Sequence, residues 1–142
     1  MYQKDYILRM LEMLATLIAG ILGLIKKGDL QQASHALENA YMDLLKNDAS
    51  LFREIPGEEL TSSLLSMHNY THDHLKVLSE LFYAEGELQL ARGNEENGRE
   101  YYEKSLILLQ FVVREARAYS LEDQSRLAQI QNRIADLKTP RS

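Results

Sequence analysis

Residues 82–106 read FYAEGELQLARGNEENGREYYEKSL, and this stretch decides the fold. Apolar residues recur with helical spacing on both sides of Gly93-Asn94, and glycine readily adopts the left-handed conformation in which helices end. Three small residues stand where two antiparallel helices would meet: Gly86, Gly98 and Ser105. They let the two backbones approach closely, and the ring of Tyr102 can fill the space that they leave. The stretch therefore predicts a tight hairpin of two helices.

A second turn of the same kind, Gly28-Asp29, occurs 65 positions before Gly93. We expect Gly28 to end a helix over residues 4–26 and Asp29 to cap a helix over residues 30–46. The second of these helices carries its apolar residues on one side: Ala33, Ala36, Leu37, Ala40, Tyr41 and Leu44. The chain is thus expected to contain two helix pairs with matching turns.

The remaining segments are expected to be helical as well. Leu51-Phe52 is a short apolar anchor, and a break follows at residues 55–57. Ser120 is expected to cap the last helix, with Asp123 three residues on in the manner of a capping box. Further helices are expected over residues 58–67, 72–92, 95–118 and 120–138.

The composition agrees with an all-α fold. The chain of 142 residues has only two prolines and seven glycines, while residues that lose little freedom in a helix dominate. No stretch shows the alternation of β-branched residues that a strand would have. The length suits one compact domain. We divide it into a first helix pair (residues 1–46), a connection (47–70), a second helix pair (71–119) and a C-terminal capping helix (120–138).

Seven residues of the second pair fall at the spacings of a tetratricopeptide repeat: Phe82, Gly86, Gly93, Gly98, Tyr102, Ser105 and Leu106. The segment resembles that repeat, and in the first pair Ala33, Leu37 and Ala40 occupy the corresponding places after the turn. Glu85 and Gln89 depart from the pattern, since the repeat usually has a leucine and a tyrosine there. The resemblance covers roughly two-thirds of the chain.

The resemblance implies that antiparallel hairpins stack as a short tetratricopeptide-like superhelix that ends in the capping helix. In this repeat class, the first helix of each pair lines a groove that holds a peptide or helix of a partner. The opening MYQKDYILRM and the two repeats are also similar to a bacterial family of short repeat proteins without a characterised function. That family supplies no catalytic residues, so the resemblance implies a binding role.

Seven residues are the candidate partner-binding positions in this groove: Ile18, Leu22, Ile25, Lys76, Glu80, Tyr83 and Glu87. Those from the first pair are strongly apolar, and such a stripe left in water would be unusual for a monomer. The last helix or residues 47–69 could cover it within the chain. A second copy could cover it instead, because a helix that is apolar all round resembles the centre of a dimer interface. A separate partner helix or peptide is the third possibility.

Charge and cysteine content exclude several classes of function. The formal net charge is -5 with acids and bases interleaved, so no basic face offers binding to nucleic acid. Cysteine is absent, which excludes disulfides and thiol nucleophiles and is compatible with the cytoplasm, where we expect the protein. Residues 13–25 are uncharged, but their flanks do not fit a signal peptide, and the segment falls short of the roughly 20 residues that cross a bilayer. Peripheral membrane association through the first helix stays an alternative.

His68 and His72 have the four-residue spacing that places two imidazoles on one helical face, with His74 close by. A metal site is therefore a second alternative, weighed against surface or capping histidines. No phosphate loop, nucleophile elbow or metalloprotease motif occurs in the sequence. We expect no cofactor and no enzymatic activity. The sequence predicts a protein–protein interaction module that binds an amphipathic segment of a partner or of a second copy.

Overall fold

The computed structural model describes residues 2–67, 69–116 and 120–138, and within these ranges the chain is helical without strands. Its elements are α1 (Tyr2–Lys26), α2 (Leu30–Leu45), α3 (Ala49–Arg53), the 3-10 helix η1 (Gly57–Glu59), α4 (Leu60–Met67), α5 (His72–Ala91), α6 (Glu95–Ala116) and α7 (Leu121–Lys138). The expected all-α class is confirmed. The expected end of the α6 helix at residue 118 lies outside the described residues.

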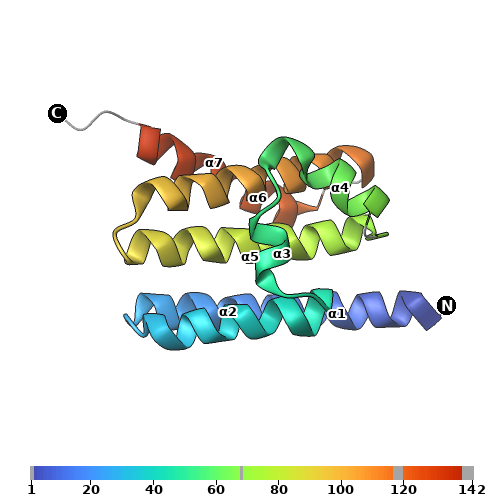
Figure 1. The fold of residues 1–142 in the computed structure, drawn as a ribbon, viewed down its shortest axis with the longest axis horizontal. Coiled ribbons are helices and arrows are strands. Elements are labelled where there is room, and N and C mark those ends of the chain that lie inside the picture. The colour runs from blue at the N-terminus through green and yellow to red at the C-terminus, as the bar shows by residue number, and fades with distance from the viewer. Residues whose placement is uncertain (1, 68, 117–119, 139–142) are drawn as a thin grey trace.

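Two antiparallel hairpins account for most of the fold (Figure 1). α1 packs against α2 to form the first hairpin, and α5 packs against α6 to form the second. α5 also contacts both α1 and α2, and so joins the hairpins, while α7 packs on α6. α3, η1 and α4 connect the two hairpins along one side of the molecule (Figure 1).

The α5–α6 hairpin is as tight as its small residues predict. Gly86 is buried, and a Cβ added there would lie 2.6 Å from Cε1 of Tyr102. A Cβ added at Gly98 would lie 3.0 Å from Cδ2 of Leu90. The Tyr102 ring therefore fills the space opposite Gly86, as the sequence predicts.

Two buried serines form hydrogen bonds between the same two helices near their middle. The hydroxyl of Ser79 donates to the backbone carbonyl of Ser105 at 2.8 Å. The hydroxyl of Ser105 donates to the carbonyl of Ser79 at 2.7 Å. These reciprocal bonds satisfy buried hydroxyls without widening the helix–helix contact.

Both predicted glycine turns are present. Gly28 and Gly93 each have φ of +85°, a conformation in which a side chain is strained. After each turn, a backbone N–H bonds back to the preceding helix: Asp29 to Leu24 at 2.9 Å and Asn94 to Gln89 at 2.8 Å. One expectation is wrong in detail, because Asp29 stands at the start of α2 but its side chain makes no capping hydrogen bond.

Replacing Gly93 by alanine should destabilise the domain by about 1 kcal/mol, because alanine is strained at positive φ. The matched control is Gly20→Ala. Gly20 lies inside α1, and an added Cβ meets no atom of another described element within 4 Å. The control should stabilise the domain by up to about 1 kcal/mol, since alanine is the better helix former. Urea unfolding of both variants measures the contrast, and equal effects would contradict it.

The core consists of the apolar helix faces that the sequence marks. The buried residues on these faces include Ala33, Leu37, Ala40, Tyr41, Leu44, Leu75, Leu78, Leu81, Phe82, Leu88, Leu109, Val113, Ile130 and Ile134. α1 is buried along one side, through Met10, Leu14, Ile18 and Ile21, while its exposed side still carries apolar residues such as Leu8, Met13, Ala15 and Ala19.

The short helix α3 lies where the sequence indicates only an apolar anchor. Phe52 is fully buried and stacks between the rings of Tyr41 and Tyr70, at centroid distances of 5.8 and 6.0 Å. The ammonium group of Lys104 donates to the backbone carbonyl of Arg53 at 3.0 Å. Five residues are too few to show a helical pattern, so α3 could not be predicted.

Glu85 is a buried charge in this core, with 2% of its surface exposed. Its carboxylate accepts hydrogen bonds from Nε of Arg53 at 2.7 Å and from the hydroxyl of Tyr41 at 3.0 Å. Burial raises the pKa of Glu85 above its ordinary 4.5, whereas the positive charge of Arg53 lowers it in part. Glu85 therefore ties α2 and α3 to α5, which accounts for a glutamate where the repeat pattern has leucine.

Candidate functional site

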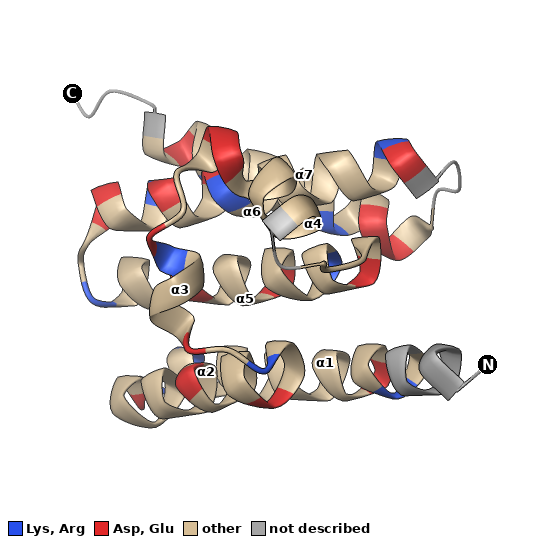
Figure 2. Cartoon of the chain, turned by 45° about the vertical axis from the view of Figure 1, so that its right-hand side comes forward, with Lys and Arg blue, Asp and Glu red and all other residues tan. Residues whose placement is uncertain are grey.

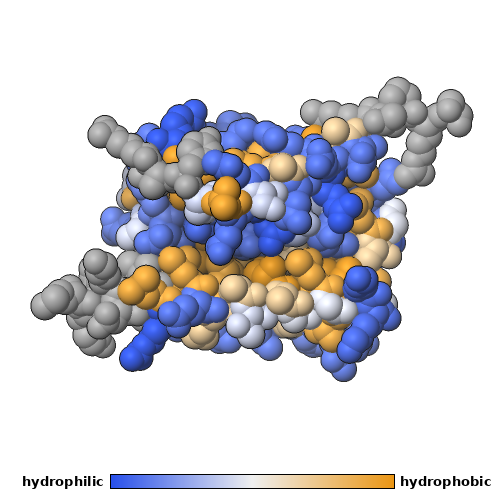
Figure 3. Space-filling view, turned by 180° about the vertical axis from the view of Figure 1, so that it is seen from behind, coloured by the Kyte–Doolittle hydropathy of each residue, from blue (hydrophilic) through white to orange (hydrophobic). Residues whose placement is uncertain are grey.

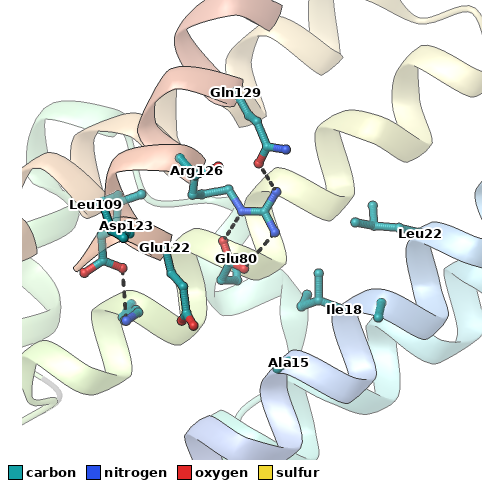
Figure 4. Close-up of a pocket in the computed structure, with 13 residues that line it drawn as sticks. Ala15, Ile18, Leu22, Glu80, Leu109, Glu122, Asp123, Arg126 and Gln129 are labelled. Atoms are coloured by element: carbon teal, nitrogen blue, oxygen red, sulfur yellow. Dashed lines mark hydrogen bonds and ion pairs between the residues drawn. The ribbon is translucent and has the colours of Figure 1, made fainter.

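An open cleft of about 530 Å³ lies between α1, α5 and α7 (Figure 4). Residues of four helices line it. α1 supplies Ala15, Ile18, Ala19 and Leu22; α5 supplies Lys76 and Glu80, with Leu109 behind them on α6; α7 supplies Leu121, Glu122, Asp123, Ser125, Arg126 and Gln129. The cleft thus has an apolar wall on α1 and a polar wall made by α5 and α7.

Ion pairs between α5 and α7 build the polar wall. Lys76 pairs with Asp123 at 3.0 Å. Arg126 holds Glu80 through two nitrogens, at 2.8 and 3.2 Å (Figure 4). These charges neutralise one another across the two helices, so they fix the position of α7 and leave little net charge in the cleft.

A third pair continues this row beyond the cleft. Arg133 donates to both carboxylate oxygens of Glu87, at 3.0 and 3.2 Å. Glu87 also accepts a hydrogen bond from the hydroxyl of Tyr102. Burial raises the pKa of Tyr102 most, and the hydrogen bond to Glu87 raises it further. Tyr83 is 4% exposed, beneath the guanidinium of Arg126 at 4.2 Å from its ring centroid. Glu87 and Tyr83 therefore serve the α5–α7 contact.

The apolar wall on α1 is left largely open. Ala15 and Ala19 are exposed, Leu22 is half-buried, and Ile18 points into the core with 2% exposed. Seen from behind the view of Figure 1, the surface has a hydrophobic band along the middle of the molecule (Figure 3). Charged residues are sparse on α1 compared with the upper helices (Figure 2).

α1 is also the one helix among the described residues that is long and apolar enough to span a membrane, judged by length and composition. The segment is Leu8–Lys26, with a mean hydropathy of 1.9, and only 22% of it is buried. A core helix of similar hydropathy would be mostly buried. The exposed apolar surface of α1 is therefore the unusual feature of this fold.

The seven candidate positions separate into three groups. Ile18, Leu22, Lys76 and Glu80 line the cleft together. Tyr83 lines a smaller pocket of about 190 Å³ further along α7, while Glu87 lies between Tyr102 and Arg133. Ile25 is half-buried and packs against the main core. The sequence missed the α7 residues, because their pairing partners on α5 are 46 or 47 positions away.

The chain itself covers most of the apolar stripe predicted on α1. Ile18 is 2% exposed, and Leu22 and Ile25 are half-buried against the core. α7 pairs with Lys76, Glu80 and Glu87 and so covers the α5 side of the groove. The connection of α3, η1 and α4 packs against α2 and α6. The open part of α1 is the neighbouring side, which carries Ala15, Ala19 and Gly23.

His74 and His72 make structural contacts at the start of α5. Nδ1 of His74 accepts a hydrogen bond from the backbone N–H of Thr71 at 3.1 Å, completing a capping box at the start of α5. Burial lowers the pKa of His74, which stacks on Tyr70. His72 meets the ring of Phe111 edge-on at 5.5 Å. His68 lies outside the described residues, among which no group of three or more potential metal ligands occurs.

The cleft can hold an elongated apolar object against α1 and offer hydrogen bonds from α7. Its exposed polar groups on the α7 side are Glu122, Ser125 and Gln129, whereas the cationic groups are engaged in ion pairs. No family model, curated protein or solved structure matches this chain.

Proposed function

We propose that the protein is a non-enzymatic protein–protein interaction module that binds an amphipathic helix in the cleft between α1 and α7. One observation carries the proposal: α1, the one described helix that is long and apolar enough to span a membrane, has only 22% of its span Leu8–Lys26 buried. Large exposed apolar surfaces in proteins usually mark binding sites. An apolar wall facing a polar one suits a helix with one apolar side.

The contact pattern supports a tetratricopeptide-like stack as the frame of this module. α5 contacts both helices of the first hairpin, as the first helix of a following repeat does. α1, α5 and α7 would then be the first helices of successive units, and the three together line the cleft. The cleft would correspond to the inner groove that such repeats use for binding. We place this activity in the cytoplasm.

Photo-crosslinking in living cells tests the proposal. A benzophenone amino acid is placed at Ala15 or at Gln129, on opposite walls of the cleft. The control position is Asn39, which is exposed on α2. We expect a discrete adduct from both cleft positions and none from Asn39. Adducts that form equally at all three positions, or at none, would refute the proposal.

Ala15→Arg should weaken binding without unfolding the domain. Ala15 is exposed on the apolar wall, so arginine fits sterically but places a charge and a long side chain in the cleft. We expect at least about a five-fold loss of the adduct at Gln129, since burying an unpaired charge is costly. Asn39→Arg is the matched control and should leave the adduct unchanged. A full adduct in the Ala15→Arg protein would contradict a role for this wall.

Membrane association through α1 is a second candidate, favoured by the hydropathy of Leu8–Lys26. A peripheral helix would lay its apolar face in the lipid interface. Flotation with vesicles of phosphatidylcholine and phosphatidylglycerol separates the two proposals. Protein that stays at the bottom of the gradient, yet gives the cleft adducts, supports the interaction module alone.

A further inference from the structure

The charged residues on the exposed face of α1 are placed so that two copies of this helix, lying antiparallel, bring opposite charges together. Among the residues of α1 whose exposure the structure describes, the charged ones are Arg9, Glu12 and Lys26, and all three are exposed. Lys27 follows directly after the helix. Glu12 and Lys26 have opposite signs, so a reversed copy can place each of them beside the opposite charge of the other.

The spacing of these residues sets one alignment. If two α1 helices lie antiparallel with Ala19 opposite Ala19, Glu12 of each copy faces Lys26 of the other. The two-fold symmetry repeats this pair, so that opposite charges meet at both ends of the overlap.

The residues between these charges allow the helices to come close. Ala15, Ala19 and Gly23 recur every four residues on the same exposed side of α1. In the alignment about Ala19, Ala15 of one copy faces Gly23 of the other. A Cβ added at Gly23 meets no atom of another described element within 4 Å, so the space above it is open. Small side chains of this kind let helix axes approach to about 8 Å.

We propose that the occupant of the α1 face is α1 of a second copy of this chain, held antiparallel about a two-fold axis at Ala19. This inference rests on the proposed function and names its partner. A partner helix of unrelated sequence would not require opposite charges at equal distances from Ala19, whereas an antiparallel second copy does. The two-fold arrangement uses the same face on both copies, as symmetric dimers do.

The area of this contact indicates a reversible dimer. α1 ends at Lys26, so two copies centred on Ala19 overlap over residues 12–26, a length of about 22 Å at 1.5 Å per residue. A seam about 10 Å wide would bury roughly 220 Å² per copy, about a quarter of what a standard stable interface buries. Leu121 on the rim of the cleft is 84% exposed and can add apolar area. We therefore expect a weak dimer that dissociates in the high micromolar range.

Cysteine crosslinking tests both the partner and its direction, since the chain has no cysteine of its own. Ala19→Cys should form a disulfide-linked dimer under mild oxidation. An equimolar mixture of Ala15→Cys and Gly23→Cys chains should form mainly the mixed dimer, because position 15 faces position 23. Asn39→Cys, exposed on α2, is the control and should stay monomeric. A parallel pair would instead give dimers of Ala15→Cys alone, which would overturn the inference.

Charge reversal provides a second measurement that leaves the core untouched. Glu12→Lys places like charges at two symmetric sites and should weaken the dimer about ten-fold in analytical ultracentrifugation. Adding Lys26→Glu to it restores opposite charges and should bring the dissociation constant back to within about three-fold of the original. Equal weakening in the single and double variants would overturn the alignment.

The two proposals can fail separately. If the protein is monomeric at concentrations up to about 1 mM and the adduct at Ala15 contains a different protein, the second copy is excluded while the interaction module stands. If neither position of the cleft gives any adduct and the protein is monomeric, both are refuted. An adduct between two copies of this chain at Ala15, together with the mixed cysteine dimer, supports both.

Discussion

Gly86→Ala is expected to destabilise the domain by about 2 kcal/mol, although alanine favours helices more than glycine does. The added Cβ would lie 2.6, 2.7 and 2.9 Å from three carbons of the Tyr102 ring. The ring is fully buried and its hydroxyl is held by Glu87, so it cannot move aside cheaply. Overpacking of this kind costs about 1–3 kcal/mol, and the clash exceeds the gain in helix propensity.

Thermal unfolding measures this effect, with a decrease of roughly 3 °C in Tm per kcal/mol for a domain of this size. Gly98→Ala is the matched control in the facing helix. Its Cβ would meet chiefly the flexible end of Leu90 at 3.0 Å, so its effect should be clearly smaller. Adding Tyr102→Leu to Gly86→Ala should cost less than the sum of the two single variants. Strict additivity would show that the ring and the glycine are not in contact.

Arg53→Met should have the largest effect of any single substitution considered, about 3–5 kcal/mol at neutral pH. Nε of Arg53 lies 2.7 Å from the carboxylate of Glu85, whose side chain is only 3% exposed. Methionine can fill much of the same space but leaves the carboxylate without its cation. The Tyr41 hydroxyl still donates one hydrogen bond, which is too little to solvate a buried charge.

The loss should depend on pH. The pKa of Glu85 is already raised by burial in the folded chain, and removing Arg53 takes away the group that opposes this shift. A carboxyl group with a raised folded pKa contributes stability that is full below its unfolded pKa and is lost as the pH rises through the folded pKa. Arg53→Met should therefore differ least from the original protein near pH 4. Its deficit should grow towards neutral pH.

A double variant separates charge from packing in this prediction. Glu85→Gln keeps an acceptor for the Tyr41 hydroxyl but carries no charge. Arg53→Met combined with Glu85→Gln should therefore recover much of the stability that Arg53→Met loses at neutral pH. Urea unfolding from pH 4 to 8 records both effects. A deficit that is the same at every pH, or no recovery in the double variant, would show that Arg53 acts through packing alone.

The sequence predicted the hairpins well because their causes are local. Gly28 and Gly93 have the positive φ that ends a helix, and Thr71 and Ser120 cap the helices that follow them. Periodic apolar residues then marked most of the buried face of each long helix. These features depend on neighbours within about four residues along the chain, so they are visible without a structure.

The candidate site was predicted only in part. The sequence placed Ile18, Leu22, Lys76 and Glu80 in one groove, and they do line one cleft. It did not reveal that α7 forms the opposite wall, because Arg126 finds Glu80 across 46 positions of sequence. The role of Glu85 was also hidden, since its partners on α2 and α3 are 44 and 32 positions away.

The sequence by itself determined the helices, their turns and the close approach of α5 to α6, because glycine conformation and apolar periodicity act over a few residues. Tertiary structure alone decided which apolar surface is covered. α7 packs on α6 and reaches α5 through ion pairs, and one side of α1 remains open. Burial depends on contacts between distant segments, and no local pattern states which segment will cover which face.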